Sequence, residues 1–168
     1  MIAKEKLNIL WSLEQTAEKY EDRVAVSDVN QELTWKELVK KAQVIGAELS
    51  EKVQPGNPVP VLLEKSSETL AVMLGIVYAG CFYVPVNPMN PTERLRKIME
   101  KLDPEVIISD EKGKEQLAAV GNGLENKVMG PEALKTATGT ELSEEQYSRL
   151  EQIQGQRQET EAIYGHVT

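Results

Sequence analysis

Few residues of this 168-residue chain belong to the types that carry covalent or metal chemistry. The sequence has one histidine, His166, two residues before its end, and one cysteine, Cys81. A nucleophile–histidine pair would need His166 as its base, and a position so close to a chain end gives that ring little to orient it. Cys81 lies in an apolar run, where a thiol is normally an inert core residue. One histidine and one cysteine also form no zinc site of ordinary spacing.

Patterns for phosphate binding and acid–base catalysis are equally sparse. The tripeptide Gly-Asn-Gly at 121–123 begins like a dinucleotide fingerprint, but the third glycine is absent and the flanking residues are polar. Lys36, Lys40 and Lys41 form a basic cluster that would bind an anion or, more commonly, form a solvated helix face. No Asp or Glu pair lies in an apolar setting that would raise its pKa. Residue types alone therefore predict no catalytic residue and no metal ligand.

The composition of the chain limits the kinds of partner that we expect it to bind. The net charge of −8 and the pI near 4.9 disfavour nucleic acid or an anionic membrane as the main partner. A single cysteine suits a reducing compartment, and the charged first residues MIAKEKLN do not resemble a signal peptide. Residues 69–92 carry no charge, but Gly80 and three prolines divide this stretch into pieces too short to span a bilayer. We therefore expect a cytoplasmic protein without a membrane span.

The elements that would position any site alternate between helical and strand patterns. This alternation is typical of an α/β fold with a parallel-rich sheet flanked by helices. The length fits one domain, 1–168, with a sizeable core. A turn is predicted at 28–32. Strands are predicted at 23–26, 59–63, 81–86, 105–109, 127–129 and 162–168, with helices between them, including 114–120 and 131–134.

Two helix starts are marked by capping residues. Thr34 and Glu37 have the spacing of a capping box, and this helix is predicted to end near Glu51. Ser66 or Ser67 is predicted to cap the next helix, in which apolar residues recur at core spacing. Gly75 lies in the interior of that helix and costs about 1 kcal/mol relative to alanine, which predicts close packing at this position.

Residues 78–95, YAGCFYVPVNPMNPTERL, form the most strictly specified segment. Gly80 suits the left-handed position after a helix, and 81–86 is a short apolar strand. The three prolines remove backbone donors, so a central strand cannot continue through them. Asn90 is the predicted N-cap of the next helix, with Pro91 in the first helical position and Glu93 completing a capping box.

The region 136–161 is polar, rich in Gln and Glu, and poor in apolar anchors. We expect it to be a mobile surface excursion. Its local helix signals are a capping box at 143–146 and a thin apolar stripe of Tyr147, Leu150 and Ile153.

Three segments together resemble the N-terminal part of an adenylate-forming (AMP-binding) enzyme. Residues 33–38, LTWKEL, are similar to the motif Leu-Thr-Tyr-x-Glu-Leu of that superfamily. Residues 78–88 are similar to Lys-Ala-Gly-Gly-Ala-Tyr-Val-Pro-Leu-Asp-Pro, and 91–95 match the helix start that follows. Residues 162–168, AIYGHVT, resemble the strand that enters the phosphate loop. The order and spacing agree over nearly the whole chain, and Tyr-Val-Pro-x-x-Pro is nearest to peptide-synthetase adenylation domains and D-alanine–carrier-protein ligases.

The chain departs from these motifs at four positions. Asn87 stands where the motif has Asp, and Cys81 replaces a Gly. His166 and Val167 replace the apolar or aromatic residues that precede the phosphate loop.

The resemblance implies a Rossmann-like N-terminal subdomain of an ATP-dependent ligase. Such a ligase, of the kind found among acyl-CoA synthetases and luciferases, joins a carboxylate to ATP, releases pyrophosphate and passes the acyl group to a thiol of CoA or a carrier protein. Thr168 would be the first residue of the phosphate loop, the one cofactor-binding residue that the resemblance assigns. ATP and Mg²⁺ would be cofactors of the parent enzyme, with the remaining adenine, magnesium and acyl segments after Thr168. We expect these 168 residues alone to bind no cofactor and to be inactive, with the rest of the ligase as their partner.

Two other interpretations stay open. One is a naturally short, non-catalytic α/β module that binds a partner protein or scaffolds an assembly. The other is a small hydrolase that uses Cys81 and His166. A subdomain separated from its enzyme would expose apolar surface, which predicts a homo-oligomer.

Overall fold

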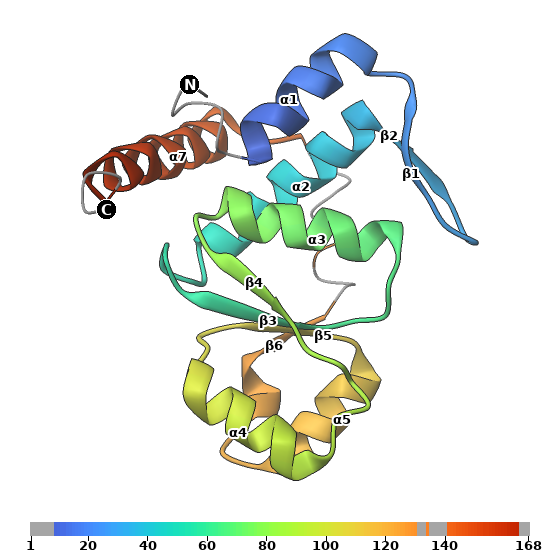
Figure 1. Ribbon diagram of the computed structural model, residues 1–168, viewed down its shortest axis with the longest axis vertical. Coiled ribbons are helices and arrows are strands. Elements are labelled where there is room, and N and C mark those ends of the chain that lie inside the picture. Colours follow the sequence, from blue (N-terminus) through green and yellow to red (C-terminus); the bar gives the residue numbers. More distant parts are fainter. Residues whose placement is uncertain (1–8, 131–133, 135–140, 165–168) are drawn as a thin grey trace.

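The computed structural model describes residues 9–130, Leu134 and 141–164, with side chains described as far as residue 155 (Figure 1). The first half contains α1 (Ile9–Tyr20), β1 (Val24–Ser27), β2 (Glu32–Thr34), α2 (Trp35–Ser50), β3 (Pro58–Leu62) and α3 (Ser67–Tyr78). The second half contains β4 (Phe82–Pro85), α4 (Thr92–Leu102), β5 (Ile107–Ser109), α5 (Glu111–Val120), the 3₁₀ helix η2 (Leu124–Lys127), β6 (Val128–Met129) and α7 (Glu144–Tyr164).

Four parallel strands in the order β4-β3-β5-β6 form the central sheet. Helix α3 covers one face of the sheet, with α2 and α1 stacked beyond it, and α4 and α5 cover the other face (Figure 1). The prediction of an α/β fold with a parallel sheet between helices is confirmed. Strands β1 and β2 form a separate antiparallel hairpin in which Ser27 pairs with Glu32.

The two faces of the sheet bury cores of different size. The larger core joins the sheet to α1, α2 and α3, and the smaller core joins it to α4, α5 and η2. Adjacent residues of β3, β5 and β6 belong to opposite cores, as the pleat requires. On β3, Val59 and Val61 face α3, whereas Leu62 faces α4 and α5.

The predicted N-caps of α2 and α3 are both confirmed. The Glu37 backbone N–H donates to Thr34 Oγ1 at 3.2 Å, and the Thr34 N–H donates to Glu37 Oε2 at 2.8 Å. Ser66 caps α3, since its Oγ accepts from the Thr69 N–H at 3.1 Å. Strand β2 was not predicted, because its three residues overlap the capping box and resemble the start of a helix.

Close packing at Gly75 is confirmed as well. A Cβ at this position would lie 2.5 Å from Ile45 Cγ2 and 3.0 Å from the Ala42 carbonyl oxygen. Gly46 on α2 has the reciprocal role, because a Cβ there would lie 2.5 Å from Tyr78 Cβ. The backbones of α2 and α3 therefore approach each other through two glycines.

The predicted start of α4 is wrong by one residue. The N-cap is Pro91, with φ −55° and ψ 144°, and no side chain caps this end of the helix. Asn90 instead belongs to the preceding turn, where its N–H donates to the Asn87 carbonyl and the Met89 N–H donates to Asn87 Oδ1. The φ of proline fits both the first helical position and the cap, so the residue type could not separate the two.

The predicted strand at 162–168 is wrong over its described part. Helix α7 continues through Tyr164. A run rich in Glu and Gln favours helix locally, and this run extends from the Ser143 cap, where the Gln146 N–H donates to Ser143 Oγ. Residues 165–168 and most of the helix predicted at 131–134 lie outside the described residues.

The segment expected to be a polar excursion, 136–161, thus holds most of a 21-residue helix. No helix in the described part of the chain combines the length and apolar character needed to cross a bilayer.

Candidate functional site

The carboxyl edge of the parallel sheet is where a fold of this kind places a ligand. The preferred position lies where the strand order reverses. Here this point lies between β3 and β5, because the chain passes from β3 to β4 on one side of it and from β5 to β6 on the other. The starts of α3 and α5 are therefore the helix N-termini to test for an anion site.

The start of α3 is already filled by side chains of the chain itself. Asp28 Oδ2 accepts hydrogen bonds from both the N–H and the Oγ of Ser67, each at 2.7 Å. Asp28 Oδ1 accepts from the N–H groups of Asn30 and Gln31. The backbone N–H of Ser67 is the main cause of a pKa of Asp28 far below its usual value, followed by the other donors around the carboxylate.

A carboxylate of the chain also occupies the start of α5. Asp110 Oδ1 accepts from the Gly113 N–H at 2.8 Å. Gly113 also lies so close to the Ser109 side chain and to Leu62 that a Cβ would have no room. Carboxylates thus occupy both helix starts and would repel a phosphate. These residues do not fit a nucleotide, and the part of the chain that the structure describes contains no cluster of metal-ligating side chains.

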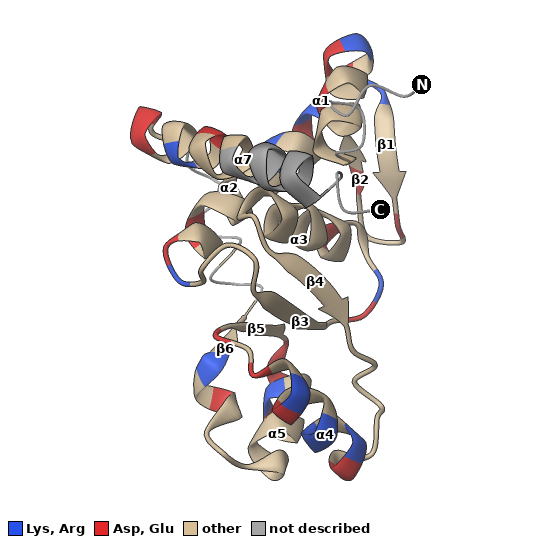
Figure 2. Cartoon of the chain, turned by 60° about the vertical axis from the view of Figure 1, so that its left-hand side comes forward, with Lys and Arg blue, Asp and Glu red and all other residues tan. Residues whose placement is uncertain are grey.

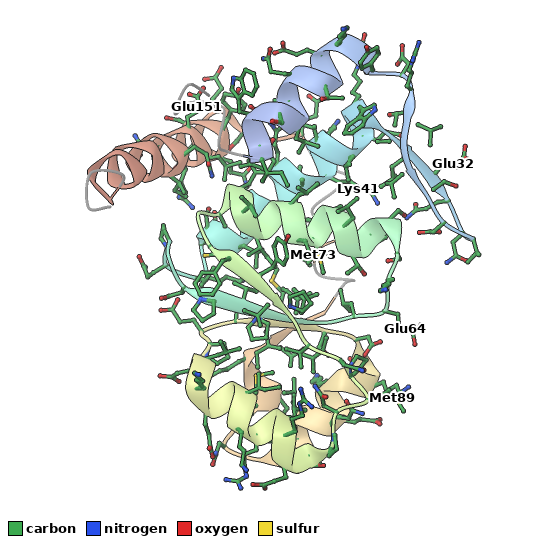
Figure 3. The ribbon with its side chains drawn as sticks, in the orientation of Figure 1. Glu32, Lys41, Glu64, Met73, Met89 and Glu151 are labelled. Carbon is green, nitrogen blue, oxygen red and sulfur yellow. The ribbon has the colours of Figure 1, made fainter. Side chains whose placement is uncertain are left out.

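The Asp28 contacts continue into a polar joint between the hairpin, α2 and α3. Gln31 Nε2 donates to Ser67 Oγ at 2.9 Å and to Glu68 Oε1 at 2.8 Å, and Lys41, which is labelled in Figure 3, pairs with Glu68. The polar groups are thus matched to one another, and the joint holds the hairpin against α3. Sequence reasoning placed Asp28 in a turn and missed this role, because Ser67 lies 39 residues further along the chain.

The basic cluster on α2 is divided among three carboxylates. Lys36 Nζ lies 3.1 Å from Glu21, Lys40 Nζ lies 3.8 Å from Glu141, and Lys41 pairs with Glu68. These contacts favour the interpretation as a solvated helix face over that of an anion site.

The candidate nucleophile is enclosed. Cys81 is 1% exposed, and its Sγ lies 3.4 Å from the Gln54 carbonyl oxygen and 3.7 Å from that of Ala79. His166 and Thr168 lie outside the described residues, so the pairing of Cys81 with His166 and the assignment of Thr168 to the phosphate loop stay predictions.

The Tyr78–Gly80 turn joins several elements. Gly80 has φ +76°, as predicted, and a Cβ there would lie 2.6 Å from Ile153 Cγ2 on α7. Gln154 Nε2 donates to the carbonyl oxygens of Val77 and Tyr78 at 3.1 and 3.0 Å, which satisfies the end of α3. Tyr78 Oη donates to Glu14 Oε1 at 2.7 Å, and burial raises the pKa of this phenol. The turn is therefore a structural junction of α1, α3 and α7.

A pocket of about 180 Å³ lies between α4, α5 and η2. Its charged groups already have protein partners: Arg96 Nη1 bonds to Glu100 at 3.0 Å, and Lys127 Nζ donates to the Pro104 carbonyl at 2.9 Å. The pocket thus offers a ligand no unmatched charge from these two cations.

Comparisons with known proteins show which family this chain belongs to. A family model described as "AMP-binding enzyme" matches residues 13–164. One of the mycosubtilin synthase subunits of Bacillus subtilis is 35% identical over 152 residues, which span 90% of this chain and 5% of that synthase polypeptide. Tyrocidine synthase 1 of Brevibacillus parabrevis is 32% identical over 122 residues, covering 72% of this chain and 11% of the synthase. The chain thus spans a small fraction of the length of these curated relatives.

Solved structures agree on the fold. VinN in complex with 3-methylaspartate superposes with a TM-score of 0.69 at 27% identity, over 76% of this chain and 35% of VinN. A fatty acyl CoA synthetase of Mycobacterium tuberculosis has a TM-score of 0.73 at 18% identity, over 82% of this chain and 29% of the synthetase. At that identity the second likeness concerns the fold alone.

Proposed function

Because this chain belongs to the AMP-binding enzyme family, we propose that it is the N-terminal subdomain of an ATP-dependent acid-activating ligase. The complete ligase would join a carboxylate to ATP, release pyrophosphate, and transfer the acyl group to a thiol of CoA or of a carrier protein. The observation that carries this proposal is the family match over 13–164 together with the relatives among peptide synthases.

In this proposal the described residues build and hold the sheet, and the chemistry lies elsewhere. The carboxylates of Asp28 and Asp110 fill the helix starts at the carboxyl edge, so ATP and Mg²⁺ would bind at other segments. By resemblance the phosphate loop would begin at Thr168. The parent enzyme would stabilise the negative charge that develops on the transferred group with cationic side chains and metal.

Isotope exchange between ATP and pyrophosphate tests this assignment. The purified 168-residue protein should show no exchange with a mixture of amino and fatty acids, and ATP with Mg²⁺ should not raise its melting temperature. An intact acid-activating enzyme run in parallel is the positive control. Measurable exchange by the 168 residues would overturn the view that the chemistry lies in other segments.

The second candidate is a naturally short, non-catalytic α/β module that binds a partner or scaffolds an assembly. It is favoured by the paired state of the polar groups at the carboxyl edge. The codons that follow Thr168 separate the two candidates. Codons for a glycine- and serine-rich phosphate loop would support the ligase, and a stop codon would support the module.

A further inference from the structure

We propose that the outer edge of β4 is an interface between two copies of this chain, centred on a two-fold axis at Tyr83. This inference rests on the edge strand and its charge environment, and it does not depend on the acid-activating chemistry.

Strand β4 ends the sheet on one side. Among the described residues its one strand neighbour is β3, with Phe82 opposite Pro58 and Val84 opposite Pro60. The N–H groups of Phe82 and Val86 donate to Asn57 and Val61 across this ladder. Because backbone groups alternate in direction along a strand, the N–H and C=O of Tyr83 point away from β3. No strand in the described part of the chain pairs with these groups, and an open strand edge is a template for another strand.

The backbone of this edge can pair with a copy of itself about Tyr83. In an antiparallel pair centred on Tyr83, the two Tyr83 residues exchange two N–H···O=C bonds. The next outward positions would place Pro85 of one copy opposite Cys81 of the other. Pro85 has no N–H, and the Cys81 N–H already donates to the Ile76 carbonyl. A pair centred on either of these residues would therefore lack its two central donors, whereas a pair centred on Tyr83 has both.

The side chains along the edge are apolar and exposed. Phe82 is 48% exposed and Tyr83 39%, on opposite faces of the strand, and Met89 in the loop beyond β4 is 71% exposed (Figure 3). Large apolar groups that meet across two antiparallel strands stabilise the pair.

The distribution of charge favours β4 as the surface through which two copies meet. The molecule carries a net charge of −8, so two copies repel each other over most approaches. Residues 69–92, which include all of β4, contain no charged residue, and β4 is free of both charge colours in Figure 2, in contrast to α4. Contact through β4 therefore keeps the charged surfaces apart. A single short strand buries little area, so the dimer should be weak and dependent on concentration.

Sedimentation velocity over a wide range of concentrations tests the proposal. The wild-type chain should shift from monomer toward dimer as concentration rises. Tyr83→Lys places two like charges directly opposite each other and should weaken dimerisation about tenfold or more. Val29→Lys is the matched control, because Val29 is 99% exposed in the hairpin turn and the substitution changes the net charge equally. This control should dimerise like the wild type, and circular dichroism should show both variants folded.

A second variant tests the two-fold geometry. Hydrogen-bonded antiparallel pairs have Cα atoms about 5.5 Å apart, within the range of a disulfide. Tyr83→Cys should therefore form a covalent dimer under mild oxidation, whereas Tyr147→Cys, at a similarly exposed position on α7, should form far less. A wild-type chain that stays monomeric at every concentration would overturn the proposal. Equal dimerisation by wild type and Tyr83→Lys would also overturn it, because the contact would then lie on another surface.

Discussion

Helices α3 and α4 are consecutive crossover helices of one sheet, and they are stabilised in different ways. In α3, nine of twelve residues are buried, and the helix is apolar nearly all round. In α4, two of eleven are buried, Leu95 and Met99, and the opposite side carries Arg96 paired with Glu93 and Glu100. Helix α3 lies between the sheet and α2, whereas α4 has solvent on its outer side (Figure 1).

The ends of α3 are also held by more contacts than the start of α4. The start of α3 receives Ser66 from its own loop and Asp28 from the hairpin, and its end receives Gln154 from α7. The start of α4 has a proline cap without a side-chain hydrogen bond. The segment that resembles the family motif, 78–95, begins at the end of α3 and includes the start of α4, so it contains both kinds of helix end. The contacts described for its residues are structural ones.

The largest expected effect is the loss of a side chain from the α3 core. Ile76 is fully buried, so Ile76→Ala should lower the free energy of unfolding by about 2–5 kcal/mol. Ile98→Ala on α4 is the comparison, and its loss should be clearly smaller because Ile98 is only partly buried. Urea unfolding followed by circular dichroism measures both. Equal losses would show that α4 is held as tightly as α3.

Glycine packing gives the next effect. Gly75→Ala should destabilise by about 1–3 kcal/mol, because the new methyl group meets Ile45 and the Ala42 carbonyl in the closely packed α2–α3 contact. Gly155→Ala is the control, in an exposed helical position with open space around it, and should stabilise by up to about 1 kcal/mol. Opposite signs for the same substitution would sharpen the contrast between packed and solvated helices. A gain at Gly75 would mean that α2 can move away at no cost.

The caps test the correction at α4 directly. Ser66→Ala removes the side chain that bonds to the Thr69 N–H and should cost about 1 kcal/mol. Asn90→Ala should change stability by less than about 0.5 kcal/mol, because Asn90 does not cap α4. Thermal and urea unfolding of the two variants provide the measurement. A loss at Asn90 as large as that at Ser66 would restore Asn90 as the cap.

Whether a feature could be predicted from the sequence depends on how far apart its interacting residues lie along the chain. The Thr34–Glu37 and Ser66 caps, the left-handed Gly80 and the strands at β3 and β4 depend on residues close in sequence, and they are confirmed. The Asp28–Ser67 joint depends on a contact across 39 residues and was not foreseen. The strand predicted at 162–168 failed over Ala162–Tyr164, because the long helix-favouring run before it continues through these residues.

The candidate site divides in the same way. The enclosed state of Cys81 could be inferred from the apolar residues around it. The carboxylates at the starts of α3 and α5 could not, because Asp110 resembles an ordinary cap and Asp28 reaches α3 only through the fold.

The smallest expected effect on stability is electrostatic. Its dependence on pH and salt should differ between the start of α3 and the surface of α4. The folded-state pKa of Asp28 is lowered by hydrogen bonds from the Ser67 backbone and its neighbours, and that of Glu93 is lowered by Arg96. For a lowered pKa, the stabilisation is fully present above the unfolded value, about 4, and is lost as pH falls through the folded value. The difference in unfolding free energy between wild type and Asp28→Asn should therefore be largest at neutral pH and should shrink between about pH 4 and pH 2.

Glu93→Gln should show the same direction with pH and a different response to salt. Its partner is an exposed cation, so added salt should remove most of its effect by screening. The donors around Asp28 are mainly backbone N–H groups and the Ser67 hydroxyl, so its effect should persist in salt. Urea unfolding at low and high ionic strength measures both differences. If salt removed the effect of Asp28 as well, the start of α3 would be held by general charge attraction, and the contrast with α4 would then rest on apolar packing alone.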